Sequence, residues 1–160
     1  MTEITLARAV HVLAVIIWIG GVSFATTAVL PLMQLRTRPL QERFALFEAI
    51  EGRFIWQARI TTLLVAASGF YMIVELDLWH RLRMIEYWWM HAMVLVWAIF
   101  TLLLFVIEPV LVHRIVHARI RAGDESIFAR MLILHVVLLT LSLVTAFAAV
   151  AGSHGVNLGF

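Results

Sequence analysis

The chain of 160 residues contains no cysteine and no lysine. Without thiols it has no disulfides, no iron–sulfur clusters and no thiolate metal sites. Any metal or cofactor must therefore be held by histidine, methionine, carboxylate or backbone groups. Because lysine is absent, all twelve basic residues are arginines.

Charged residues are also scarce, at 14% of the chain, whereas 63% is hydrophobic and the mean hydropathy is +0.98. Soluble domains are roughly 45–50% apolar. Four apolar stretches, at about residues 5–32, 55–76, 87–107 and 127–151, each approach the ~20 residues that span a bilayer. They predict an all-α fold class, an integral membrane bundle of four transmembrane helices forming a single domain over residues 1–160.

The arginines predict the topology. Nine lie in, or within a few residues of, the loops between spans 1 and 2 and between spans 3 and 4, and three lie toward the other side. By the positive-inside rule, both termini are expected in the periplasm and the two basic loops in the cytoplasm of a bacterial inner membrane. Since these arginines flank membrane spans, the pI of about 9.9 is not evidence for nucleic-acid binding; membrane lipid is the expected partner and no nucleic-acid partner is expected.

Two segments outside the spans carry helical patterns. The stretch LQERFALFEAIEGRFIW predicts an amphipathic interfacial helix between spans 1 and 2, ended by Gly52. Span 3 is expected to continue as a helix to Gly123, with a kink at Pro109. Glu108 and Arg59 stand at corresponding edges of spans 3 and 2, which predicts an ion pair between them or, alternatively, a contribution to a proton path.

Three histidines, His11, His91 and His135, lie within apolar spans. Spans 1 and 3 run in the same direction, and His11 and His91 are each about five or six residues, or ~8–9 Å, from the start of their spans. An isolated polar group in hydrocarbon costs several kcal/mol, so such histidines are expected to be functional or at least paired. The alternative is that each only hydrogen-bonds a neighbouring helix.

Two imidazoles at matched depth on different helices suit axial ligation of a b-type haem. Arg8, one turn outward from His11, is placed to pair with a haem propionate. Further candidate cofactor-binding residues are Trp18 and the small residues that would make room for a flat ring, Gly20, Gly21, Ser68 and Gly69.

Copper is an alternative to haem as the metal bound by this region. Imidazole with thioether is a plausible Cu(I) set, and one external segment contains His80, Met84, Met90, His91 and Met93. His135 with His113 is the next candidate pair of haem ligands, on the opposite side of the membrane.

Several stretches resemble a known family, namely ARAVHVLAVIIWIGGVSF in span 1, FIWQARITTLLVAASG in span 2 and WWMHAMVLV in span 3. Together they look like the HemJ family of membrane protoporphyrinogen oxidases and, more loosely, the CopD copper-resistance membrane proteins and other small four-helix b-type cytochromes. The resemblance implies haem b at His11 and His91. The family's span 3 also tends to carry a lysine two residues after its histidine, where this chain has Met93, and that departure counts against porphyrinogen oxidation.

These observations predict a b-type haem-binding membrane oxidoreductase that passes single electrons between a reductant and a quinone or redox protein. Haem iron with two histidine ligands has no open coordination position, which favours electron transfer. A CopD-like protein that handles or transports copper without redox catalysis is the alternative. A porphyrin substrate and a homo-oligomer are both left open.

Overall fold

The structure, a computed structural model, describes residues 2–155, except for the side chains of residues 110–113. Its helical elements are α1 (Thr2–Phe24), η1 (Ala25–Val29), α2 (Leu30–Gln34), α3 (Leu40–Glu75), η2 (Leu78–Arg83), η3 (Ile85–Tyr87), α4 (Trp88–Leu102), η4 (Leu103–Val112), α5 (His113–Arg121) and α6 (Ile127–Ser153). Four helices are long and apolar enough to cross a membrane, Thr2–Gln34, Leu40–Glu75, Ile85–Pro109 and Ile127–Ser153. The predicted all-α chain with four candidate spans is confirmed.

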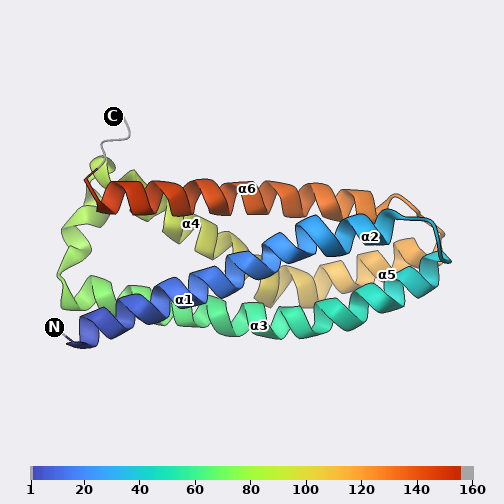
Figure 1. The fold of residues 1–160 in the computed structure, drawn as a ribbon, viewed down its shortest axis with the longest axis horizontal. Coiled ribbons are helices and arrows are strands. Elements are labelled where there is room, and N and C mark those ends of the chain that lie inside the picture. Colours follow the sequence, from blue (N-terminus) through green and yellow to red (C-terminus); the bar gives the residue numbers. More distant parts are fainter. Residues whose placement is uncertain (1, 156–160) are drawn as a thin grey trace.

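The four helical columns form an elongated up-and-down bundle (Figure 1). Both ends of the chain lie at one end of the bundle, called here the terminal end. The loops of residues 35–39 and 122–126 lie at the other, called the arginine-rich end. The first column crosses the bundle obliquely, so α1 packs on α3 near the terminal end while α2 packs on α6 at the arginine-rich end.

Helix α3 is longer than a bilayer is thick. Its 36 residues extend about 54 Å at 1.5 Å per residue, against roughly 30 Å of hydrocarbon. The segment expected to form a separate interfacial helix is the first part of this continuous helix, and the expected break at Gly52 is wrong. Phe44 and Phe47 are buried against α2, α5 and α6, in a cluster that includes Phe128. The segment is therefore packed into the bundle, and a separate interfacial helix is not confirmed.

Prolines coincide with both π-helical segments of the described chain. Pro109 lies inside η4, and Pro31 comes two residues after the end of η1. A proline has no N–H for the carbonyl four residues earlier, and its ring crowds that carbonyl. The backbone accommodates both effects by widening to π-helical geometry, which keeps each column continuous. At Pro109 the predicted kink therefore takes the form of a π-helical segment.

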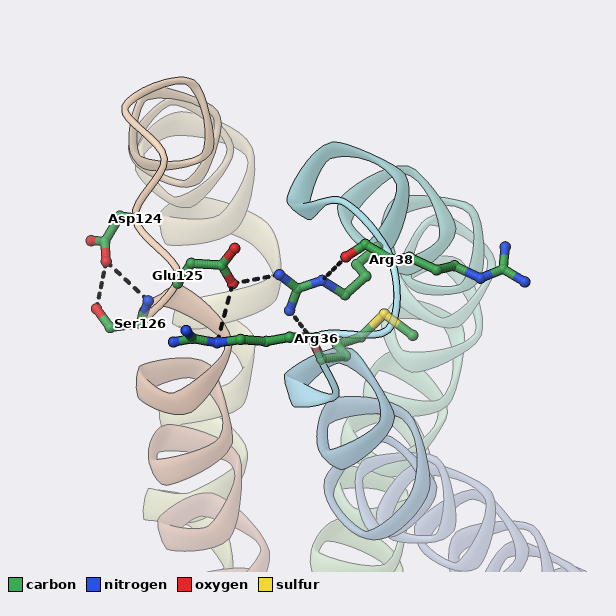
Figure 2. Close-up of polar contacts among 7 residues, drawn as sticks. Arg36, Arg38, Asp124, Glu125 and Ser126 are labelled. Carbon is green, nitrogen blue, oxygen red and sulfur yellow. Dashed lines mark hydrogen bonds and ion pairs between the residues drawn. The ribbon is translucent and has the colours of Figure 1, made fainter.

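A single buried arginine joins the two loops of the arginine-rich end. The Arg43 side chain is only 4% exposed. It donates from Nη1 to the Met33 carbonyl at 2.7 Å and from Nε to the Arg38 carbonyl at 3.1 Å, and Nη2 pairs with Glu125. Figure 2 shows Glu125 also reaching Arg36, whose Nε lies 3.9 Å from the carboxylate. Arg43 thus fixes the start of α3 to both the preceding loop and the loop before α6.

The turn between α5 and α6 is set by backbone chemistry. Gly123 has φ +73° and ends α5 as predicted, with its N–H on the Ile120 carbonyl and the Asp124 N–H on the Arg119 carbonyl, the Schellman pattern. Asp124 accepts hydrogen bonds from the Ser126 backbone and hydroxyl (Figure 2), and these lower the pKa of Asp124 from its ordinary value. The ionised carboxylate therefore stabilises this turn, and the contribution is lost as the pH falls through its lowered pKa.

Replacing Arg43 tests whether its hydrogen bonds hold the arginine-rich end together. Hydrogen bonds to charged groups contribute about 1.5–3 kcal/mol each. Because Glu125 remains partly exposed to water, we expect Arg43→Gln to lower the free energy of unfolding by about 2–3 kcal/mol in total. Unfolding in detergent micelles, followed by tryptophan fluorescence, measures the change. Arg38→Gln is the control, since it removes an exposed side chain and leaves its carbonyl in place; equal losses in both variants would contradict this role.

The contact between α1 and α3 depends on a missing side chain. A Cβ built on Gly21 would lie 2.1 Å from Cε2 of Phe54, whereas one built on Gly20 would meet nothing within 4 Å. We expect Gly21→Ala to lower stability by about 1–3 kcal/mol through overpacking. Gly20→Ala is expected to be neutral or slightly stabilising, because alanine is the better helix former. Thermal unfolding of the two variants in the same detergent makes the comparison, and matching midpoints would contradict the packing.

Candidate functional site

His11 lies between α1 and α3, close to the terminal end. It is half-buried, and its Nδ1 lies 3.0 Å from Oγ of Ser68. A Cβ built on Gly69 would lie 3.2 Å from Cε1 of His11. Ser68 and Gly69 were both predicted as cofactor-binding residues, and both lie directly against the histidine. The one orients the ring and the other leaves space for it.

The hydrogen bonds around Ser68 indicate which nitrogen of His11 carries the proton. Ser68 is buried, and its hydroxyl lies 2.5 Å from the Leu64 carbonyl and 3.3 Å from the Val65 carbonyl. A hydroxyl has one hydrogen to donate, so with that hydrogen on a carbonyl its oxygen accepts from Nδ1–H. The assignment leaves the lone pair on Nε2. A histidine whose Nδ1–H is held in this way is a typical metal ligand through Nε2.

His91 is held differently. The residue is exposed, with Nε2 2.9 Å from the Leu82 carbonyl and Nδ1 3.2 Å from the Tyr87 carbonyl. Both ring nitrogens therefore face backbone carbonyl acceptors. His91 ties the start of α4 to η2. No recorded contact of the described residues joins His91 to His11.

The other residues predicted for the site, His80, His135, Arg8 and Met93, lie on four different helices. His80 is exposed, with Nδ1 on the Asp77 carbonyl, and His135 is half-buried, with Nδ1 on the Met131 carbonyl. In each case Nδ1 is therefore held by a carbonyl three or four residues earlier in the chain. Arg8 is exposed and Met93 is half-buried. The side chain of His113 lies outside the described residues.

Trp18 belongs to the bundle core. It is 4% exposed and packs edge-on against Phe100, with ring centroids 4.8 Å apart. Its Nε1 is buried without a hydrogen-bond partner among the described residues. This contact joins α1 to α4 about two helical turns further along α1 than His11. Similarly, Gly21 makes room for Phe54.

A second polar site lies toward the arginine-rich end. A cavity of about 30 Å³ is lined by Phe44, Glu48, Glu51, Glu108, Val116, His117 and Met131. These residues come from α3, η4, α5 and α6, so the cavity lies inside the bundle. It is large enough to hold a water molecule.

Ion pairs border this cavity. The predicted pair is confirmed, since Nη2 of Arg59 lies 2.9 Å from Oε2 of Glu108 and the same guanidinium donates to the Leu104 carbonyl at 3.0 Å. His117 Nε2 lies 2.8 Å from Oε1 of Glu48. The cavity wall therefore includes both members of the histidine–glutamate pair. It also includes Glu108, whose partner Arg59 lies outside the wall.

Sequence reasoning missed Glu48 and Glu51. Both lie in the segment predicted as an amphipathic interfacial helix, and neither was predicted as a site residue. Phe44, Glu48 and Glu51 are spaced four and three residues apart, which places both acids on the helix face of a buried phenylalanine. That spacing was the available signal.

Comparisons of the chain with family models, curated proteins and solved structures find no match. Among the described residues, no group of three or more histidine, cysteine, aspartate or glutamate side chains is placed to hold a metal ion. A haem requires only one or two axial ligands from the protein, so this result bears on bare metal sites and not on haem.

Removing the Ser68 hydroxyl tests the orientation of His11. We expect Ser68→Ala to shift the ¹⁵N resonances of the His11 ring, because Nδ1–H loses its acceptor. Nitrogen NMR of histidine-labelled protein in micelles measures the shift, with His11→Gln identifying the signal. Ser142→Ala is the matched control, a buried serine whose hydroxyl bonds the Leu138 carbonyl. An unchanged His11 signal in Ser68→Ala would contradict the hydrogen bond.

Proposed function

We propose that the protein is a b-type haem-binding membrane oxidoreductase that transfers single electrons. The observation that supports this proposal best is the environment of His11. Its ring is half-buried between two membrane helices, oriented by Ser68 through Nδ1 and accommodated by Gly69. These features fit a residue that would bind iron through Nε2.

The environment of His91, the proposed second haem ligand, fits iron binding less directly than that of His11. His91 is the partner implied by the resemblance to the HemJ family, yet both of its nitrogens face backbone carbonyls. Its Nε2 becomes available only if the contact with the Leu82 carbonyl opens. We therefore assign His11 as the better supported ligand. His91 stands as the proposed partner, conditional on a rearrangement of η2 relative to α4.

The surrounding chain would tune the bound group. Haem, when bound, supplies reversible one-electron chemistry, while axial ligands, hydrogen bonding and burial set its potential. Ser68 would strengthen the donor character of His11 by accepting from Nδ1–H. Arg8, exposed one turn further out, would offer a cation for a propionate. Met93 at the position of the family's lysine is the reason that we do not extend the proposal to porphyrinogen oxidation.

The proposed setting is a bacterial inner membrane, with both termini in the periplasm. Of the twelve arginines, the nine that flank the two basic loops lie toward the arginine-rich end, which supports placing that end in the cytoplasm. The proposed electron partners are a quinone or a redox protein at the terminal end.

An optical spectrum of the purified protein tests the proposal. We expect a Soret band and sharp α and β bands on reduction, both lost in His11→Ala. His154→Ala is the control, because that histidine is exposed near the end of α6 and bonds only its neighbours. His91→Ala should also lose the low-spin spectrum if its ring replaces the Leu82 contact by the iron.

Two results would overturn the proposal. A colourless protein that carries stoichiometric copper would replace it with the copper-handling alternative. A low-spin spectrum that survives in His11→Ala would remove the residue on which the proposal depends and turn attention to His135.

A further inference from the structure

The cavity between α3, η4, α5 and α6 contains titratable groups that electron transfer at His11 does not use. We propose that it is a proton-exchange site, in which the Glu51 carboxyl takes up a proton from water at the arginine-rich end through the Glu48–His117 pair. This inference does not depend on haem, because every group in it belongs to the chain.

Glu51 is the one cavity carboxyl without an ion-pair partner among the described residues. Glu48 pairs with His117 and Glu108 pairs with Arg59. Glu51 is half-buried and is repelled by both of those carboxylates. A third negative charge in the same small cavity would be costly, and a proton on Glu51 removes that cost. The carboxyl is thus placed to alternate between a neutral and an ionised form.

Arg59 keeps the inner wall of the cavity charged. Its guanidinium bonds both Glu108 and the Leu104 carbonyl, and the two side chains of the pair are only 20% and 26% exposed. This ion pair occupies the Glu108 carboxylate, so Glu108 is held as the partner of Arg59. The exchangeable proton is then assigned to Glu51, while Glu108 acts as a fixed negative charge.

The Glu48–His117 pair forms the outer wall. Its side chains are 38% and 35% exposed, so water reaches both. Imidazole gains and loses a proton near neutral pH. In the proposed transfer, imidazolium at His117 gives its proton to the Glu51 carboxylate through Glu48 or a cavity water and becomes neutral imidazole. External water then returns a proton to the ring, so one proton moves inward and no other bond changes.

Other charged groups on the surrounding helices are directed elsewhere. From α6 the cavity is lined by Met131, whose neighbour Arg130 pairs with Asp124 at 3.6 Å. His135 on the same helix bonds the Met131 carbonyl through Nδ1. Arg53 on α3 and Arg114 on α5 are exposed. The balance of charge at the cavity is therefore set by its own two pairs and Glu51.

Infrared difference spectroscopy of the purified full-length protein, between acidic and alkaline buffer, tests the assignment. We expect a carbonyl stretch from a protonated carboxylic acid that titrates with pH and shifts in heavy water. Glu51→Gln should lose this band, and Glu42→Gln should keep it, because Glu42 is an exposed acid on the same helix. His117→Gln should keep the band and slow its appearance after a rapid pH change.

The wild-type measurement keeps the test decisive even if a variant folds poorly. A wild-type protein without a titrating carboxyl band would overturn the proposal, and so would a folded Glu51→Gln variant that retains the full band. A band that moves when sodium replaces choline at constant pH would identify a cation site instead. Because none of these readouts requires a cofactor, a failure here is distinct from a failure of the haem proposal.

Discussion

The buried guanidinium of Arg43 is the interaction on which the arrangement of the bundle depends. A charge that is 4% exposed must be fully compensated, and Arg43 meets this requirement with two backbone carbonyls and Glu125. Those partners belong to the end of the first column, its following loop and the loop before α6. Three of the four columns are therefore held in register at one end, which fixes how α3 presents its faces further along.

Because α3 is fixed at this end, the packing of its first turns is also determined. Because the helix is about 54 Å long and uninterrupted, its first turns extend beyond the hydrocarbon and pack as a soluble core does, around Phe47 and Phe128. The acids at positions 48 and 51 lie in this part of the helix and line the cavity. The same acids deeper in the membrane would carry a much larger desolvation cost.

The four spans and the Arg59–Glu108 pair could be predicted from the sequence, because hydropathy and charge position act locally. The packing of residues 40–52 could not, since an amphipathic face is equally compatible with lipid headgroups and with a protein core. The role of Ser68 could not be predicted from the sequence either. Its spacing indicates a small inward residue, but only the register of α1 on α3 shows that its hydroxyl meets His11. The position of His91 along its span does not reveal that the carbonyl of Leu82 in η2 competes for the same nitrogen.

Helix α3 contributes residues to both proposed sites, Ser68 and Gly69 to one and Glu48 and Glu51 to the other, which fixes the distance between them. Ser68 and Glu51 are separated by about 25 Å along one helix axis, so a charge at His11 and a proton at Glu51 affect each other little by direct electrostatics unless the intervening medium is apolar. Val65, Trp18 and Phe100 form an apolar cluster in part of this interval, and such a core screens charge far less than water. The ion pair of Arg59 with Glu108 lies in the same interval and adds a fixed dipole to it.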